Sequence, residues 1–452
     1  MRRRFSCAVP ALLSIGLAAC GGSTAGGAGN GGGPSIAQSG VLRQPATSVS
    51  EAAIGGAVAA NNAFALDLYA HLRASEPVGN LLTSPLSASL ALTMTYAGAA
   101  GATKTEMASA LHLGAAAESV FDGQNALTQL LAQRASDALG ADAKTASENG
   151  TAAPSPDDYQ VQVVNSVWGQ KAYPWEAPFL DVLARSYGTG VYLEDFVASP
   201  DPARLAINAW VSAHTADKIE NLLPSGAIDS DTRMVLVNAI HLKLPWATAF
   251  PASATTPGTF TTGSGKAVSP PFMRQTQTYG YLDDGQAQVA SLPLAGGDLR
   301  VVIALPRGDL ATYESGLSET SAAFAPLGSA MVDLSLPKVA FTSPTFSLVS
   351  ALKAMGMTRA FDPATADLTA MCAHPPDGTL YVSDVLQKAM IAMQETGVEA
   401  AAATAVVIDR ELAIAEQETM VVNRPFVIAI VDATGAILFL GHVDDPTAAG
   451  GP

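Results

Sequence analysis

Cysteine is scarce in this chain of 452 residues, where it occurs only at Cys7, Cys20 and Cys372. The first two lie in an N-terminal stretch that has the features of a processing signal, described below. Cys372 is then alone, so no internal disulfide is expected. The fold must therefore be stabilised by packing, and we expect Cys372 to be a passive residue and not a catalytic thiol.

Charge is also low, at 14% charged residues, and acidic residues outnumber basic ones to give a formal net charge of −16. An acidic protein repels phosphate backbones, and no basic run offers a polyanion site, so no nucleic-acid partner is expected. The hydrophobic content of 48% is enough for a large core. Length alone favours two or three domains.

Motifs for common enzyme chemistry are absent from the sequence. The closest two of the six histidines, His214 and His241, are 27 residues apart, so no zinc-ligand spacing occurs. No Gly-x-Ser-x-Gly motif occurs, and "GSGK" at 263–266 lacks the remaining residues of a phosphate-binding loop. We expect no metal, no cofactor and no enzyme activity, although a hydrolase with dispersed catalytic residues stays open.

The N-terminus has the pattern of an export signal, with a basic start "MRRRF", an apolar stretch "AVPALLSIG" and "LAAC" ending at Cys20. The small residues before the cysteine resemble the bacterial lipobox. That resemblance implies a signal peptide over residues 1–19, cleavage before Cys20 and a diacylglycerol on its thiol. An ordinary secretory signal is the alternative. The apolar stretch is too short to span a membrane comfortably.

Residues 20–50 begin with "GGSTAGGAGNGGGPS" after the cysteine, and we predict that they form a flexible tether. The acyl chains would hold the protein on a membrane face. Gly21 stands where an aspartate would favour inner-membrane retention. The expected location is therefore the cell envelope, at the outer membrane, on its periplasmic or surface face.

Apolar spacing beyond residue 55 predicts helices first and strands later. Helical patterns occupy 61–74, 102–113 and 205–223, and Ser84-Pro85 favours another helix start. Strand patterns occupy 159–170, 232–246, 299–306, 330–341 and 379–395, and 424–443 predicts a hairpin turned at 433–435. The small polar run 136–158 predicts an irregular surface segment. This order is α+β.

One segment carries contradictory signals. "QETGVEAAAATAVVIDRELAI", residues 394–414, contains four successive alanines, which favour helix, and then Val-Val-Ile, which favours strand.

A series of motifs in order over residues 58–446 resembles the serpin family. They are "NLLTSPLSASLALTMTYAGAAGATKTEM", "VNSVWGQ", "YLEDF", "INAWVSAHTADKIENLLP", "LVNAIHLKLPWATAF", "VVIALP", "LPKVAF", "LKAMGMTRAFDPATADLTAM", "LYVSDVLQKAMIAMQETGVEAAAATAV" and "NRPFVIAIVDATGAILFLGHVDDP". The resemblance implies one domain over 55–446, despite the length. It implies a serpin fold, with helices packed on a large central mixed β-sheet, smaller sheets and an exposed reactive centre loop at about 395–422.

The family's mechanism implies an irreversible suicide-substrate inhibitor of serine or cysteine endopeptidases. The protease cuts the loop, and the cleaved loop inserts into the central sheet and traps the acyl-enzyme as a covalent complex. The expected protein is a monomer whose partner is its target protease. The alternative is a non-inhibitory serpin that binds or stores a ligand.

The resemblance places the hinge of this loop in the segment with mixed signals. Its predicted residues are Glu395, Gly397, Val398, Glu399, Ala400, Ala401, Ala402, Ala403 and Thr404. In a strand, one face would carry only small or apolar residues and one hydroxyl, at Val398, Ala400, Ala402, Thr404, Val406 and Ile408. The other face would carry the acids Glu399 and Asp409. This sorting fits a strand that becomes central in a sheet after cleavage.

The resemblance implies the reactive bond at Glu411–Leu412, when residues are counted along the hinge as in the serpin family. The rival is Arg410–Glu411, one residue earlier, which would suit trypsin-like proteases. Register favours the first bond, and the frequency of basic cleavage sites favours the second.

The resemblance also places a buried polar cluster, the shutter, beneath the opening of the sheet. Ser84, Ser87 and Asn238 match it, and Gln387 stands where the family often has a histidine. Since glutamine both donates and accepts hydrogen bonds, the cluster can persist. Trp246 is assigned to the breach, at the end of the long apolar strand.

Overall fold

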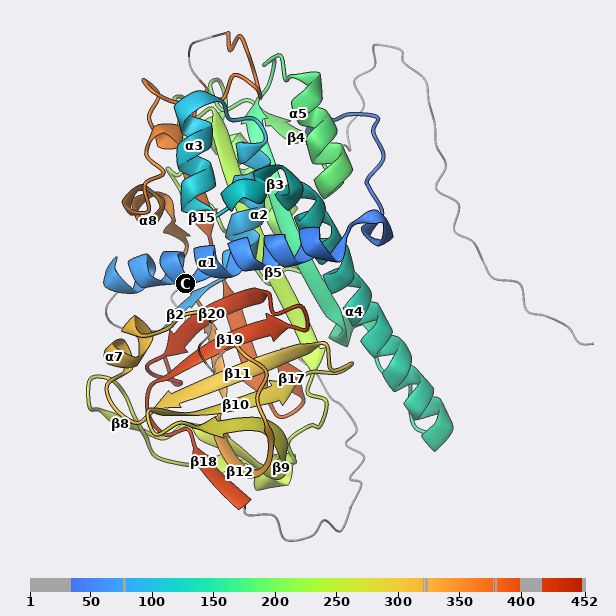
Figure 1. Cartoon of the computed structure of the whole chain (residues 1–452), viewed down its shortest axis with the longest axis vertical. Helices are drawn as coiled ribbons and strands as arrows, with labels where there is room; N and C mark the ends of the chain where they lie inside the picture. Colours follow the sequence, from blue (N-terminus) through green and yellow to red (C-terminus); the bar gives the residue numbers. More distant parts are fainter. Residues whose placement is uncertain are drawn as a thin grey trace, which may run out of the picture. The chain divides into compact units, whose positions relative to one another are not determined.

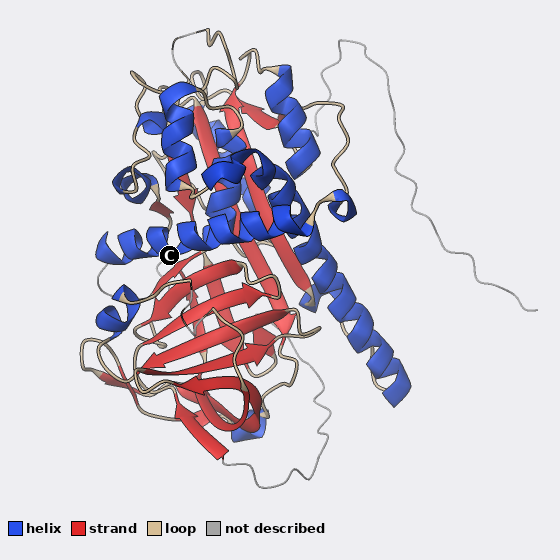
Figure 2. Cartoon of the chain, viewed as in Figure 1, coloured by secondary structure: helices blue, strands red, loops and turns tan. Residues whose placement is uncertain are grey.

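The computed structural model describes residues 34–75, 79–319, 321, 324–376, 378, 380–398 and 417–448. Helices dominate the first third of this part, and strands dominate the remainder (Figures 1 and 2). The α+β prediction is therefore confirmed. Two large sheets carry most of the strands.

The first of these, which we call the main sheet, has the strand order β1-β4-β3-β5-β17-β16-β13, with β15 pairing with β5 and with β14. Its strands are β1 (Ser35–Ala37), β3 (Gln160–Gln170), β4 (Val191–Glu194), β5 (Met234–Pro245), β13 (Val339–Thr342), β14 (Phe346–Ser347), β15 (Asp384–Gln387), β16 (Met390–Gln394) and β17 (Gly397–Val398). The sheet is mixed, because β4 is parallel to β3 and β15 is parallel to β5. The long apolar strand β5 lies centrally, as its continuous hydrophobicity predicts.

The second sheet has the order β18-β12-β9-β10-β11-β19-β20-β2, with β6 pairing with β9. Its strands are β2 (Leu81–Thr83), β6 (Thr256–Pro257), β9 (Pro271–Asp283), β10 (Ala287–Pro293), β11 (Leu299–Pro306), β12 (Ser329–Pro337), β18 (Gln417–Val421), β19 (Phe426–Asp432) and β20 (Ile437–Val443). β7 (Phe260–Thr261) and β8 (Ala267–Val268) form a separate small sheet.

The hairpin of β19 and β20 forms where the sequence predicts it. Gly435 in the turn has a φ of 87°, a conformation that glycine adopts without steric cost. The Asp432 carboxylate closes the same turn by accepting a hydrogen bond of 2.6 Å from the amide of Thr434. Every residue of both strands is buried, so this hairpin belongs to the core.

Helices pack on both sheets. The longer ones are α1 (Glu51–Ser75), α2 (Pro85–Tyr96), α3 (Gly101–Ala110), α4 (Val120–Asn149) and α6 (Pro200–His214), and the short ones are α5 (Ala177–Val182), α7 (Leu310–Ser315) and α8 (Val349–Ala354). The described chain also contains a π-helical turn (Leu183–Tyr187) and the 3-10 turns Ala46–Ser48, Gly114–Ser119, Pro156–Asp158, Ala252–Ala254 and Arg359–Phe361.

Two of these helices cover opposite faces of the main sheet. α2 begins at Pro85, and the Ser84 hydroxyl caps it by accepting from the amide of Ser87. Every residue of α2 is buried, and the helix contacts β3, β5 and β20. α6 covers the sheet through a separate core cluster that includes Ile207, Val235 and Val237.

The prediction of an irregular segment over 136–158 is wrong for its first half. α4 continues to Asn149 and ends at Gly150, which has a φ of 65°. Alanine has the highest helix propensity, so the alanine-rich sequence supports a long helix. Arg134 of α4 forms an ion pair with the buried Asp432, which anchors the helix beside the β19–β20 turn.

The predicted tether over 20–50 is also corrected, because residues 34–50 are folded. β1 pairs antiparallel with β4, from Ser35 opposite Leu193 to Ala37 opposite Val191. Gly190 allows this approach, since a Cβ there would lie 2.2 Å from the carbonyl oxygen of Ala37. The glycine-rich composition ends just before β1, so composition alone did not reveal the strand.

A buried polar cluster joins three elements far apart in the sequence. His442 on β20 and Glu314 on α7 lie 2.7 Å apart, Nδ1 to Oε1, and the Tyr69 hydroxyl of α1 lies 2.9 Å from the same imidazole nitrogen. The other ring nitrogen lies 2.9 Å from the carbonyl oxygen of Gly79. Each polar group has a partner, which offsets the cost of burying it.

Among the described helices, none combines the length and the apolar character that crossing a membrane requires.

We predict that Gly190→Ala detaches β1, because the new methyl group collides with the backbone of Ala37. Amide hydrogen exchange across residues 35–44 should become faster by about tenfold or more. Gly40→Ala is the matched control, since no atom lies within 4 Å of its added Cβ. Equal exchange in the two variants would contradict the packing of this segment.

Candidate functional site

The main sheet is divided along its middle. β15 pairs directly with β5, from Asp384 opposite Val235 to Gln387 opposite Asn238. Beyond this point β17 lies between β5 and β16 and pairs antiparallel with both. The sheet is therefore closed at one end of β5 and opened by one strand width at the other.

β17 contains two residues of the predicted hinge. Val398 lies opposite Leu244 of β5 and Met393 of β16, and Gly397 lies opposite Pro245 and Gln394. The Val398 side chain is 2% exposed and belongs to the core cluster that contains Leu244 and Met393. The chain thus enters the opening as the first two residues of a central strand, with Val398 facing inward.

The turn before β17 is anchored by Glu395, another predicted hinge residue. Its carboxylate accepts hydrogen bonds from Lys338 Nζ at 2.8 Å and Thr255 Oγ1 at 2.9 Å. Burial raises the pKa of Glu395, but the bonds from Lys338 and Thr255 and a backbone hydrogen bond outweigh it and hold the pKa below its ordinary value. The carboxylate therefore stays charged near neutral pH.

Trp246, the predicted breach residue, holds the same turn from the end of β5. Its indole Nε1 donates to the carbonyl oxygen of Gln394 at 2.7 Å, and its backbone amide donates to that of Thr396 at 3.1 Å. The backbone amide of Phe250 donates to the carbonyl oxygen of Glu395 at 2.8 Å. Three successive carbonyl groups of the turn are thus bonded to the segment at and after the end of β5.

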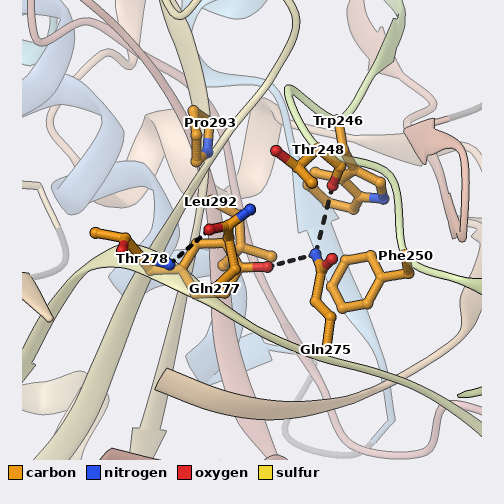
Figure 3. Close-up of a pocket in the computed structure, with 9 residues that line it drawn as sticks. Trp246, Thr248, Phe250, Gln275, Gln277, Thr278, Leu292 and Pro293 are labelled. Atoms are coloured by element: carbon orange, nitrogen blue, oxygen red, sulfur yellow. Dashed lines mark hydrogen bonds between the residues drawn. The ribbon is translucent and has the colours of Figure 1, made fainter. Parts of the chain in front are cut away.

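A small cavity of about 220 Å³ lies beside Trp246 (Figure 3). The Gln275 amide donates to the Tyr279 hydroxyl at 2.5 Å and to the Thr248 carbonyl oxygen at 3.4 Å. The rings of Trp246 and Phe250 meet edge to face, with centroids 5.9 Å apart. The indole is therefore held by this ring contact and its hydrogen bond, with open space beside it.

Three of the four predicted shutter residues, Ser84, Asn238 and Gln387, meet where the closed part of the sheet ends. Gln387 Oε1 accepts from Thr83 Oγ1 at 2.6 Å and from the Ser84 amide at 3.1 Å. Gln387 Nε2 donates to the Ser84 carbonyl oxygen at 2.9 Å and to Asn238 Oδ1 at 2.7 Å. Gln387 thus makes four hydrogen bonds while only 1% exposed, and they link β2, the start of α2 and β5.

Ser87 lies apart from Gln387 and bonds to the neighbouring strand, because its hydroxyl donates to Asn165 Oδ1 of β3 at 2.8 Å. Sequence reasoning missed Asn165 and Thr83, although both lie in quoted motifs, and Thr83 precedes the predicted Ser84. It also missed Lys338, although this residue lies within the strand pattern 330–341 and the quoted motif "LPKVAF".

The remaining predicted site residues lie outside the described residues. These are Cys20, Glu399, Ala400, Ala401, Ala402, Ala403, Thr404, Arg410, Glu411 and Leu412. Cys372 is described and buried, and burial raises the pKa of its thiol. Within the described ranges, no group of three histidine, cysteine or acidic residues could hold a metal ion.

The structure thus has a central sheet with an opening, a strand that enters the opening and a polar cluster at the closed end. A comparison with protein families gives a result that agrees with these features. The family model described as serpin (serine protease inhibitor) matches residues 59–446. The chain belongs to the serpin family. Residues 34–50, including β1, lie outside that match.

The alignments with known relatives extend over most of this serpin and most of each relative. It is 33% identical to human Serpin B4 over 86% of this chain and 98% of that one. It is 32% identical to bovine leukocyte elastase inhibitor over 86% and 99%. An uncharacterized serpin-like protein from Methanosarcina mazei is 30% identical over 86% and 87%.

Solved structures show the same fold. Tengpin, described as a thermophilic serpin in the native state, superposes with a TM-score of 0.76 at 25% identity over 91% of this chain and all of tengpin. Human thyroxine-binding globulin complexed with thyroxine gives 0.73 at 27% identity over 88% of this chain and all of the globulin. Maspin, at 22% identity and a TM-score of 0.74, shows likeness of fold. The serpin fold is therefore established for this chain.

We predict that Gln387→Leu lowers the free energy of unfolding by about 2–4 kcal/mol, because it removes the hydrogen-bond partner of the buried Thr83 hydroxyl, the Ser84 amide and Asn238 Oδ1. Thermal unfolding followed by circular dichroism measures the change. Gln133→Leu on the exposed face of α4 is the control, with an expected change within about 0.5 kcal/mol. Equal melting of both variants would show that the cluster does not stabilise the closed sheet.

Proposed function

We propose that this serpin inhibits serine or cysteine endopeptidases as a suicide substrate and is not itself an enzyme. The protease attacks the loop that follows β17 and forms an acyl-enzyme. The loop inserts into the main sheet before water releases the protease, which is carried along with its active site distorted. The observation that carries the proposal is β17, which already occupies the first two positions of the strand that the loop would form.

The register of β17 supports a specific path for insertion. Carried on in the same register, Thr404 comes opposite both Asn238 and Gln387, at the polar cluster. Thr404 has the one hydroxyl on the inward face. Asn238 Nδ2 is buried there without a hydrogen-bond partner among the described residues, so the hydroxyl can accept from it. Insertion of Thr404 and of the residues after it must then replace the pairing of β15 with β5, which begins at Gln387 and Asn238.

The energetics favour complete insertion. About a dozen new backbone hydrogen bonds, at about 1 kcal/mol net each, give a stabilisation on the order of 10 kcal/mol. Burying Val406 and Ile408 adds about 1.5–3 kcal/mol each. The intact protein is then kinetically trapped, and cleavage of the loop releases it.

The reactive bond is proposed at Glu411–Leu412, with Arg410–Glu411 as the rival. The first would suit glutamate-preferring proteases, and the second would suit trypsin-like proteases, whose pocket holds a carboxylate. The names of the relatives include inhibitors of elastase and of plasminogen activator, and they do not select between the two bonds.

We also propose that the protein is a monomer held in the cell envelope by lipid on Cys20. The "LAAC" motif supports this proposal. The described chain begins at Pro34 and β1 begins at Ser35, so residues 21–34 lie in the sequence between the modified cysteine and β1. The outer membrane is the proposed site, on its periplasmic or surface face.

A panel of serine and cysteine proteases tests the function. We expect at least one trypsin-like or glutamate-preferring protease to form a complex that survives SDS electrophoresis. Mass spectrometry of the released C-terminal fragment identifies the bond, since it begins at Leu412 or at Glu411. Complete cleavage without a complex across the panel would instead support a binding or storage serpin.

Val398→Arg is the matched variant for the same assay. Val398 is 2% exposed between β5 and β16, so an unpaired arginine would have to be buried at the leading end of the inserting strand. We expect the variant to be cleaved as a substrate, with complex yield reduced by about tenfold or more. An unchanged yield would contradict the inward orientation of this position during insertion.

A further inference from the structure

The segment that follows β1, residues 38–44, presents an apolar tip to solvent, and we call this segment the edge loop. Leu42 at its tip is 86% exposed, more than any other large hydrophobic side chain among the described residues, and Val41 is 42% exposed. The next most exposed, Leu205 of α6, reaches 52%. Single exposed leucines are common in folded proteins, so the way in which the edge loop is held decides what this one indicates.

Hydrogen bonds fix the edge loop on the N-terminal side of its tip. The Ser39 hydroxyl donates to the Asp181 carboxylate of α5 and accepts from the amide of Val41 at 3.1 Å. In Figure 1 the loop runs in blue beside α5. Gly40 lies in open space, because no atom comes within 4 Å of a Cβ added there. The tip is therefore attached to the folded body but not covered by it.

Further hydrogen bonds fix the edge loop on the C-terminal side of the tip. The Gln44 amide donates to the Arg185 carbonyl oxygen at 2.9 Å. The Gln44 carbonyl oxygen accepts from the side-chain amides of Asn125 at 2.8 Å and Gln129 at 2.9 Å, both on α4. Arg43 Nε donates to Asn125 Oδ1 at 2.9 Å. The neighbours of Leu42 thus hold it in an exposed position, and a preformed contact loses little conformational entropy on binding.

The proposed lipid anchor brings a membrane within reach of this tip. Residues 21–34 join Cys20 to β1, and they span at most about 50 Å when fully extended. A second contact made by an anchored chain is in effect intramolecular, so even a weak apolar contact is populated. The acyl chains supply the affinity for the membrane, and the tip needs only to orient the folded part.

The size of the tip and the charge of the protein favour a bilayer over a protein partner. A stable protein interface buries about 800 Å² on each partner, and two neighbouring side chains provide much less. The net charge of −16 gives no attraction to anionic lipid headgroups. Binding at the boundary between headgroups and acyl chains increases with the apolar area that is buried there, and Val41 and Leu42 supply such an area.

We propose that Val41 and Leu42 insert into the surface of the membrane that holds the Cys20 lipid, and that they orient the serpin on it. This inference rests on the proposed lipid anchor. The strand order β1-β4-β3-β5-β17 separates the β1 edge from β17 by four strand spacings, about 19 Å. Docking through the edge loop therefore keeps the hinge, and the loop that a protease attacks, away from the lipid.

Quenching of a fluorophore by lipid tests this proposal. The full lipidated chain is reconstituted in vesicles of phosphatidylethanolamine and phosphatidylglycerol that contain nitroxide-labelled phospholipid. Gly40→Cys carries the fluorophore beside the tip, and Gly328→Cys, before β12 of the second sheet and equally open, is the matched control. Cys372 is 1% exposed and stays unlabelled. We expect quenching by about half or more at position 40 and little quenching at position 328.

A charge at the tip provides the matched variant. Leu42→Asp should lower the quenching at position 40 by about fivefold, because the carboxylate would have to leave water. Leu282→Asp is the control, since Leu282 is a 39% exposed leucine on β9 of the second sheet, and it should leave the quenching unchanged. If position 40 is quenched no more than position 328, or if Leu42→Asp is quenched as the parent is, the tip does not insert.

Two further readouts separate this proposal from the anchor and from another occupant. Mass spectrometry shows whether Cys20 carries diacylglycerol. Its absence would overturn the anchor and the docking together, whereas a lipidated chain with an unquenched label would overturn the docking alone. Energy transfer between donor-labelled and acceptor-labelled copies, in place of quenching by lipid, would assign the tip to a second copy of this chain. No protease is present, so the outcome does not depend on inhibition.

Discussion

The rest of the structure depends on how backbone hydrogen bonds are distributed between β5 and the strand beside it. β15 pairs directly with β5 as far as Gln387 and Asn238. Beyond that level, β17 lies between β5 and β16. A loop that continues β17 gains about 1 kcal/mol for each hydrogen bond it adds. The same sheet therefore contains a favourable place for the loop and, at its closed end, the pairing that must be replaced.

Helices and hydrogen-bonded side chains pack against both faces and both ends of this sheet. The fully buried helix α2 lies beneath it, and α6 covers it with a separate apolar cluster. Gln387 joins the closed end to α2 and β2 through four hydrogen bonds. At the open end, Trp246 and Glu395 fix the turn from which the loop starts. Side chains at both ends thus hold the sheet in a form in which β17 lies between β5 and β16 at the open end while β15 pairs with β5 at the closed end.

Much of this could be predicted from the sequence, because apolar periodicity and ordered motifs reflect burial along the chain. The central position of β5, the last hairpin and the shutter cluster followed from them. Contacts between distant residues could not be predicted in this way. Tyr69, Glu314 and His442 carry no common pattern, β1 is three residues long, and the alanine-rich half of α4 resembled a loop in composition. Such features depend on which surfaces meet after folding.

The central claim is that the intact chain is trapped in a less stable state than the one it reaches once its loop is cut. Comparison of thermal unfolding for the intact protein and for protein cleaved at Arg410, Glu411 or a nearby residue tests this claim most directly. Insertion of the loop adds about a dozen backbone hydrogen bonds, which stabilise the cleaved form by on the order of 10 kcal/mol. Because about 1 kcal/mol shifts the unfolding midpoint by about 2–4 °C in larger domains, the midpoint of the cleaved form should rise by tens of degrees. A cleaved form that melts at or below the midpoint of the intact protein would contradict the account.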